Sequence, residues 1–122
     1  MISDKTTSII KLRELVKNFI EDRDWSKYHN PKDIAVSIVI EASELLEVFQ
    51  WVKDTDLDKA VKEPVRLVKL AEELGDVMIY CFSLANVLDI DISQAVVKKI
   101  EKNKGRYPVE RVKGDYKKYT EL

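Results

Sequence analysis

Two pairs of acidic residues have the spacing that places both members on one face of a helix. Glu41 precedes Glu44 by three residues, and Glu73 precedes Asp76 by three, which makes each pair neighbours on a helix surface. At about 100° per residue, Glu41 and Glu73 fall inside the apolar stripes of their segments. Only Lys69 lies within helical pairing distance of either pair. Because a buried, unpaired carboxylate costs several kcal/mol, we expect a cation from elsewhere.

The two acidic pairs lie at similar distances from the polar stretch 53–63, so an antiparallel helical hairpin would bring them face to face. Four converging carboxylates are hard oxygen ligands, which select Mg²⁺ or Mn²⁺ and leave positions for water and a phosphate group. Two alternatives stay open: the acids form a solvated helix face, or Arg66, Lys69 or a neighbouring chain neutralises them. The pattern predicts a magnesium or manganese site.

The segments that must position these acids are predicted to be long helices. Only three glycines and three prolines occur, and they fall between stretches with helical hydrophobic period. The predicted helices span residues 7–22, 31–52, 64–88 and 92–103. A short helical piece is expected around 57–62, and the loop 23–30 and the tail after Pro108 are expected to be irregular. Asn30 is the expected cap of the second helix, Asp91 or Ser93 caps the fourth, and Gly105 is placed to end it.

These elements predict a single all-α domain over residues 1–122, a four-helix-type bundle with an antiparallel central hairpin. Segments 31–52 and 64–88 are apolar around more than half of their circumference. Three neighbouring helices would not cover that surface, so we expect a homo-oligomer.

Composition excludes several classes of function. Lys and Arg total 21, Asp and Glu total 22, and the net charge of −1 gives no long-range attraction to nucleic acid or acidic membranes. Cys81 and His29 are the only residues of their types, which excludes an intrachain disulfide and a site with two histidines. The longest apolar run has six residues, whereas a membrane span needs roughly 20. We expect a cytoplasmic protein with no nucleic-acid or membrane partner, whose chemistry uses carboxylates, lysines or hydroxyls.

The two acidic pairs across a helical hairpin resemble those of the all-α MazG-like nucleoside triphosphate pyrophosphohydrolases. Longer segments narrow the resemblance to the dCTP pyrophosphatase branch: Arg23-Asp24-Trp25, Tyr28-His29, Phe49-Gln50-Trp51, the run from Glu72 to Tyr80, Arg106-Tyr107-Pro108, and Lys118-Tyr119-Thr120-Glu121-Leu122. The resemblance covers nearly the whole chain. It implies Mg²⁺-dependent cleavage of a deoxynucleoside triphosphate, dCTP or a modified dCTP, between the α and β phosphates, to the monophosphate and pyrophosphate. It also implies a homo-oligomer, with a tetramer favoured over a dimer, that sanitises the nucleotide pool.

The resemblance assigns roles by position. The acids Glu41, Glu44, Glu73 and Asp76 take the metal-ligand and catalytic roles. Nucleotide-binding positions are matched by Trp25, Tyr28, His29, Trp51 and Tyr80, and the residues that meet phosphates and sugar by Lys99, Asn103 and Tyr107. Two departures matter. Val16 stands where the branch carries a histidine, which puts strict dCTP preference in doubt, and Ile40 stands where many broader members have a further glutamate, so their general base cannot be carried across.

Elementary geometry is compatible with these secondary residues but does not require their roles. On a helix running to residue 52, Trp51 would lie on nearly the face of Glu44 and about 10 Å from it, the reach from phosphates to base. It would then stack a base or pack the helix end. Trp25 and Tyr28 bind the base or close the open end of the bundle, and His29 alone is also a common hydrogen-bonded loop residue. Lys99 and Asn103, four residues apart, bind phosphate or form part of a solvated lysine-rich end.

Three rival functions remain. The first is the same hydrolysis of other or damaged nucleotides. The second is a non-catalytic helical interaction module whose acids bind a basic partner. A helix-turn-helix DNA binder is disfavoured by the balanced charge and by the lack of a short basic recognition helix after a tight turn.

Overall fold

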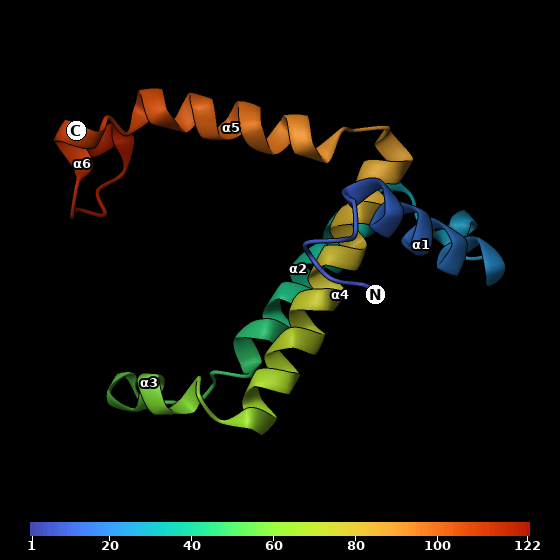
Figure 1. The fold of residues 1–122 in the computed structure, drawn as a ribbon, viewed down its shortest axis with the longest axis horizontal. Coiled ribbons are helices and arrows are strands. Elements are labelled where there is room, and N and C mark those ends of the chain that lie inside the picture. The colour runs from blue at the N-terminus through green and yellow to red at the C-terminus, as the bar shows by residue number, and fades with distance from the viewer. The chain divides into compact units, whose positions relative to one another are not determined.

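A computed structural model describes all residues from 1 to 122, and all of its regular elements are helices (Figure 1). The α-helices are α1 (Ile9–Asp22), α2 (Pro31–Glu47), α3 (Leu57–Ala60), α4 (Pro64–Leu88), α5 (Ile92–Arg106) and α6 (Val109–Val112), and the 3-10 helices are η1 (Ser26–Tyr28), η2 (Asp54–Asp56) and η3 (Tyr119–Glu121). There is no strand, which confirms the all-α prediction. The chain forms two compact units, Met1–Asp89 and Ile90–Leu122, which are described separately.

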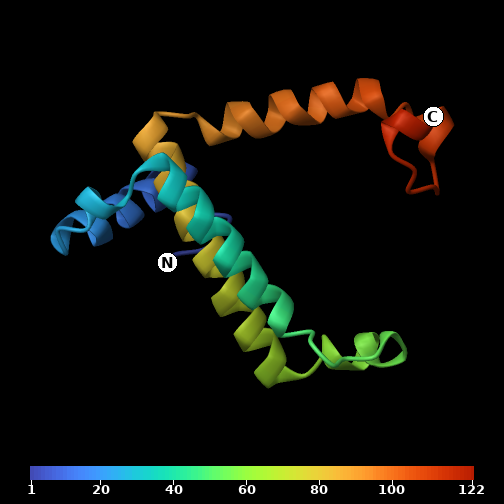
Figure 2. The ribbon, with the colours of Figure 1, turned by 180° about the vertical axis from the view of Figure 1, so that it is seen from behind.

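The first unit is built around the hairpin of α2 and α4, which lie side by side and run in opposite directions (Figures 1 and 2). Both helices begin where the sequence predicts. The Asn30 side chain accepts the amide of Asp33 at 2.9 Å, and Pro31 and Pro64 occupy first-turn positions, where a missing N–H costs nothing. The connection contains the predicted short helical piece as α3. The hairpin that presents the acids is therefore specified by its starts and its polar connection.

The second predicted helix was expected to run to residue 52, and this is wrong, because α2 ends at Glu47. The next amides bond three residues back, from Val48 to Leu45, Phe49 to Leu46 and Gln50 to Glu47. Arg66 Nη1 also donates to the Val48 carbonyl oxygen at 2.7 Å, and Trp51 adopts a left-handed φ of 71°. These three-residue bonds, and the hydrogen bond that the Val48 carbonyl accepts from Arg66, end the helix before Trp51.

Helix α1 packs on α4 and contributes two buried side chains to a small core. It begins at Ile9, slightly later than predicted, because the Ser8 hydroxyl accepts the amide of Lys11 at 3.1 Å. Val16 and Ile20 form a buried cluster with Phe82 of α4. Large apolar side chains elsewhere on the hairpin stay exposed, among them Val36, Val39, Ile40 and Leu46.

The second unit consists of α5 and the segment after it. Asp91, rather than Ser93, caps α5 by accepting the amide of Gln94 at 2.8 Å. The prediction that Gly105 ends this helix is wrong, because α5 continues to Arg106. The stop comes from Pro108, which disfavours a helical conformation in the preceding residue. The tail is irregular apart from the short helices α6 and η3, which the sequence analysis did not predict.

The four-helix bundle, the single domain and the oligomer stay predictions. No helix combines the length and apolar character that a membrane crossing requires.

Candidate functional site

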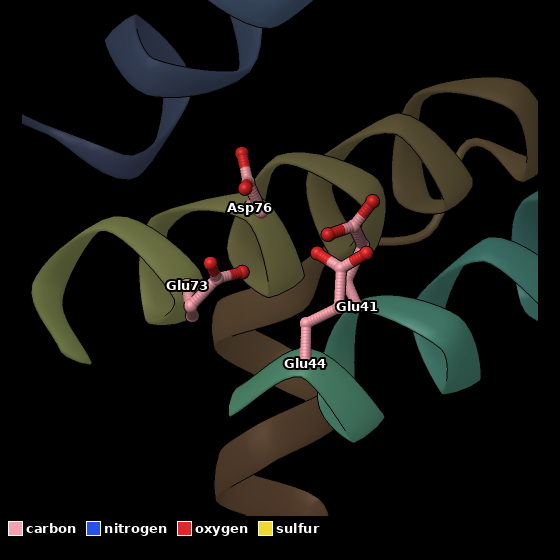
Figure 3. Close-up of side chains that lie close together, drawn as sticks. All are labelled: Glu41, Glu44, Glu73 and Asp76. Carbon is pink, nitrogen blue, oxygen red and sulfur yellow. The ribbon is translucent and has the colours of Figure 1, made fainter. Parts of the chain in front are cut away.

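The two predicted acidic pairs meet across the α2–α4 hairpin. One ligand oxygen from each of Glu41, Glu44, Glu73 and Asp76 lies within 4.8 Å of the others. Figure 3 shows the two side chains of α2 and the two of α4 gathered in this place. Glu73 is buried at 6% exposure, and the other three are half-buried. The predicted convergence of four carboxylates is therefore present, and we call this set the acidic cluster.

One cation pairs with the acidic cluster. Lys69 Nζ lies 2.9 Å from Oε1 of Glu73, its neighbour one turn along α4. The other oxygen, Glu73 Oε2, is buried and has no hydrogen-bond partner. Arg66, the other candidate for neutralising the acids, contacts Val48 and Glu63 instead. The predicted alternative of neutralisation thus holds for one oxygen of Glu73 through Lys69, and the cluster keeps an excess of negative charge.

The crowded carboxylates alter the proton affinity of the site. The pKa of Glu44 is raised from an ordinary 4.5 to about 6, first by the side-chain hydrogen bond with Glu41 and then by the charge of Glu41, with smaller effects from desolvation and Glu73. The pKa of Lys69 is also raised, chiefly by its hydrogen bond to Glu73. The Glu44 shift follows from carboxylates brought close together, and the Lys69 shift follows from the carboxylate with which it pairs. Without metal, the raised pKa means that Glu44 holds its proton more tightly than an isolated glutamate does.

The donor set fits a divalent cation. All four residues supply carboxylate oxygens, which suit Mg²⁺ or Mn²⁺ better than soft metals. The buried, unpartnered Oε2 of Glu73 marks an acceptor whose burial is costly unless a cation or donor meets it. A ligand at this point would be surrounded by side chains from both helices of the hairpin.

Trp51 is not where the sequence argument placed it. It follows α2 in a turn, has a positive φ of 71° and is 90% exposed. The argument that it continues the helical face of Glu44 is therefore wrong, because the helix ends four residues before it. A hollow of about 320 Å³ adjoins it, lined also by Asp56, Lys59 and Arg66. Its role in base binding stays a prediction.

The other aromatic positions separate into two places. The Trp25 ring packs edge-on against Phe19 of α1, with centroids 5.8 Å apart, and Tyr28 is exposed beside Lys27. His29 lies edge-on to Tyr80 of α4 at 6.3 Å, and its Nδ1 is buried without a partner. Tyr80 is one turn beyond Asp76, so this contact adjoins the acidic cluster along α4.

Val16, the position where the resembled branch carries a histidine, is 8% exposed in the core with Ile20 and Phe82. Its side chain also lines an apolar hollow of about 440 Å³ between α1 and α4. This position is therefore a packing position in the present chain.

The remaining predicted residues belong to the second unit. Lys99 and Asn103 lie one turn apart on α5, and Tyr107 is its C-cap. The Tyr107 ring packs edge-on against Tyr119 of η3 at 6.0 Å, and the Arg106 guanidinium lies 4.5 Å from the centre of the same Tyr119 ring. The sequence analysis missed this aromatic contact, although both segments were among those that carry the family resemblance.

Comparisons with known proteins agree with the geometry. The model of the MazG-like family matches residues 36–122. The dCTP pyrophosphatase 1 of Mus musculus is 40% identical over 111 residues, and that of Homo sapiens is 37% identical over the same length. The aligned region is 91% of this chain but 65% of each relative, so the chain spans about 65% of the length of these curated relatives. A crystal structure of a pyrophosphatase from Archaeoglobus fulgidus has a TM-score of 0.77 and 38% identity, and the match covers 88% of this chain and 99% of that one.

Proposed function

This chain belongs to the MazG-like family, and from that premise we propose that it is a Mg²⁺-dependent nucleoside triphosphate pyrophosphohydrolase. Its substrate is a deoxynucleoside triphosphate, dCTP or a modified dCTP, and its products are the monophosphate and pyrophosphate. The role is sanitation of the nucleotide pool. The names of the curated relatives, dCTP pyrophosphatase 1, support the substrate and the reaction.

The observation that carries this proposal is the acidic cluster. Four carboxylates from two helices lie within 4.8 Å, and the one paired cation, Lys69, reaches a single oxygen of Glu73. A purely structural cluster of this kind would be destabilising, because like charges repel and buried carboxylates lose hydration. A divalent cation removes both costs. Metal binding is therefore the simplest reason for the acidic cluster.

The chemistry divides between the cation and the protein. When bound by Glu41, Glu44, Glu73 and Asp76, Mg²⁺ would offset charge on the phosphates and lower the pKa of a water ligand. The hairpin holds these ligands on two helices, so little reorganisation is needed during the reaction. One of Glu41 and Glu44 orients the attacking water.

We assign the remaining contacts from the resemblance, with support from position. Tyr80 lies one turn beyond Asp76 on α4, and the His29 ring lies edge-on to it. This position suits contacts to the sugar or base. Trp51 offers an exposed ring and Trp25 a ring braced by Phe19, and each is able to stack on a base. The resemblance alone assigns nucleotide contacts to Tyr28, Lys99, Asn103 and Tyr107.

Self-association is part of the same proposal, with a tetramer favoured over a dimer. Six hydrophobic side chains are buried in the chain, a small core for 122 residues. In contrast, Val39 and Leu46 of α2 are 68% and 70% exposed. Apolar surface of this extent on a hairpin is typical of a subunit interface.

The test is a product assay with the purified chain, Mg²⁺ and a panel of deoxynucleoside triphosphates. We expect pyrophosphate and the monophosphate, with dCTP or a modified dCTP cleaved fastest. Orthophosphate as the product would exclude α–β cleavage. No turnover of any nucleotide, with intact helical structure, would favour an interaction module instead.

A further inference from the structure

Arg66 joins the two helices that carry the acidic cluster. Its Nη1 donates to the carbonyl oxygen of Val48 at 2.7 Å, and its Nη2 lies 3.4 Å from Oε2 of Glu63. The Nε atom is buried and has no hydrogen-bond partner, so Val48 is the main acceptor of this guanidinium. The contact places a cation at the C-terminal end of α2, where carbonyls lack helical partners and the helix dipole is negative.

The contact between Arg66 and Val48 lies at the same sequence offset from the acids on both sides of the hairpin. Arg66 precedes Glu73 by seven residues on α4, and Val48 follows Glu41 by seven residues at the end of α2. Seven residues are close to two helical turns, so on each side the contact and the acid lie about 10 Å apart along the axis. Because the helices are antiparallel and the offsets are equal, a single register allows both the Arg66–Val48 bond and the approach of Glu41 to Glu73.

Repulsion among the four carboxylates opposes this register of α2 against α4. Sliding α2 along α4 by one turn would move the acids by about 5.4 Å, more than the 4.8 Å within which their ligand oxygens lie. Before metal binds, the four carboxylates repel one another and favour such a separation. Apolar contacts between the helices are non-directional and resist sliding weakly. A directional bond from a cation to the α2 backbone is the device that opposes it.

We propose that Arg66 is a positioning residue, which fixes the register of α2 against α4 and so keeps the two acidic pairs at metal-binding distance. Arg66 forms no ion pair with any of the four acids and acts through the Val48 backbone. The inference rests on the proposed function only in that the acidic cluster binds the metal.

Arg13 provides a matched control. Its Nε donates to Asn86 Oδ1 at 2.9 Å and its Nη2 to the Ala85 carbonyl oxygen at 3.2 Å. It thus joins α1 to α4 by the same kind of bond. Loss of Arg13 should weaken the fold without changing the register of the acids.

The experiment titrates Mn²⁺ into the metal-free chain of 122 residues without nucleotide and measures free Mn²⁺ by electron paramagnetic resonance. We expect Arg66→Met to raise the Kd about tenfold or more, the scale seen when residues that orient metal ligands are lost. Arg66→Lys keeps the charge and a donor, so it should recover part of the affinity. Arg13→Met should lower Tm and leave the Kd within about twofold. In the nucleotide assay, Arg66→Met should need more Mg²⁺ but keep its kcat at saturating Mg²⁺.

Parental Mn²⁺ affinity in folded Arg66→Met would overturn the positioning role. If circular dichroism shows that this variant does not fold, Arg66→Lys and Arg66→Gln decide, since Gln keeps an amide donor without the charge. Weakened binding in Arg66→Gln with recovery in Arg66→Lys supports the proposal, and equal parental affinity in both overturns it. Absence of Mn²⁺ binding in the parent would instead overturn the proposed function.

Discussion

The acidic cluster and Trp51 are held in different ways, although Trp51 follows Glu44 by only seven residues. The four acids sit on two long helices whose register brings their oxygens within 4.8 Å. Trp51 follows the end of α2, with a left-handed backbone and 90% of its side chain exposed. The four carboxylates are therefore preorganised within one chain. In contrast, few side chains surround the Trp51 ring. We infer that metal binding depends on the hairpin, whereas the Trp51 ring has little support from its surroundings.

The largest expected effect comes from Glu73→Gln, which removes the buried ligand. We expect turnover of dCTP to fall by at least about 1,000-fold, because loss of a metal ligand removes several kcal/mol of transition-state stabilisation. Helical content should stay intact and Tm should stay level or rise, since a buried charge is removed. Steady-state kinetics and circular dichroism measure both.

The matched control is Glu72→Gln, which changes the neighbouring, exposed acid. It should keep nearly full activity. Full activity in Glu73→Gln, with the control also active, would mean that the acidic cluster is not the catalytic centre.

The next effect concerns the other side of the comparison. Trp51→Ala should raise KM for dCTP, dUTP and dTTP alike by about 10- to 100-fold, since stacking is worth roughly 1 to 3 kcal/mol per base and tolerates any base. Tm should not change, because the ring is almost fully exposed. Tyr116→Ala, at another exposed aromatic, is the control. An unchanged KM for every nucleotide would make Trp51 a surface or interface residue and remove the base pocket from this end of the hairpin.

A smaller effect sharpens the account of the cluster itself. Lys69 pairs with Glu73 at 2.9 Å, but its side chain is 58% exposed. It therefore competes weakly with a divalent cation. Lys69→Met should tighten Mn²⁺ binding by a factor of about 2 to 5, the range of a solvent-screened ion pair. The control is Lys62→Met, at an exposed lysine between α2 and α4, which should leave Mn²⁺ binding unchanged. Weaker binding in Lys69→Met would show that this lysine supports the ligands rather than competing with metal.

The smallest effect is a pH dependence of the metal-free protein. The pKa of Glu44 is raised to about 6 beside Glu41, so its proton is bound more tightly in the folded chain than in the unfolded chain. The stability it contributes is present below about pH 4.5 and is lost as the pH rises through about 6. The parent should therefore lose Tm over this window relative to Glu44→Gln, and Mg²⁺ should offset the loss. Parallel Tm curves for the two proteins would contradict the raised pKa.

The fold was predictable where single residues set helix boundaries. Asn30 with Pro31, and Pro64, start the two hairpin helices as expected, and period-3.6 patterning then fixes which face the acids occupy. The convergence of the acids followed from these local rules, because the two helix starts and the polar connection predict an antiparallel hairpin with the two pairs at similar distances from the turn.

The errors occur where a tertiary contact or a later residue decides. The end of α2 depends on Arg66, which reaches the Val48 carbonyl from 18 residues away, and no local pattern contains that bond. Gly105 was given more weight than Pro108, although the missing amide of proline is the stronger stop. The pairing of Tyr107 with Tyr119 joins two segments whose separate patterns do not indicate contact.

Mn²⁺ binding to the parent and to Glu73→Gln, measured by electron paramagnetic resonance without nucleotide, tests the central claim most directly. If the acidic cluster is the metal site, the parent binds Mn²⁺ saturably, Glu72→Gln binds it equally well, and Glu73→Gln binds it at least about 10- to 100-fold more weakly. Equal binding by the parent and Glu73→Gln, or no binding by the parent, would contradict the account.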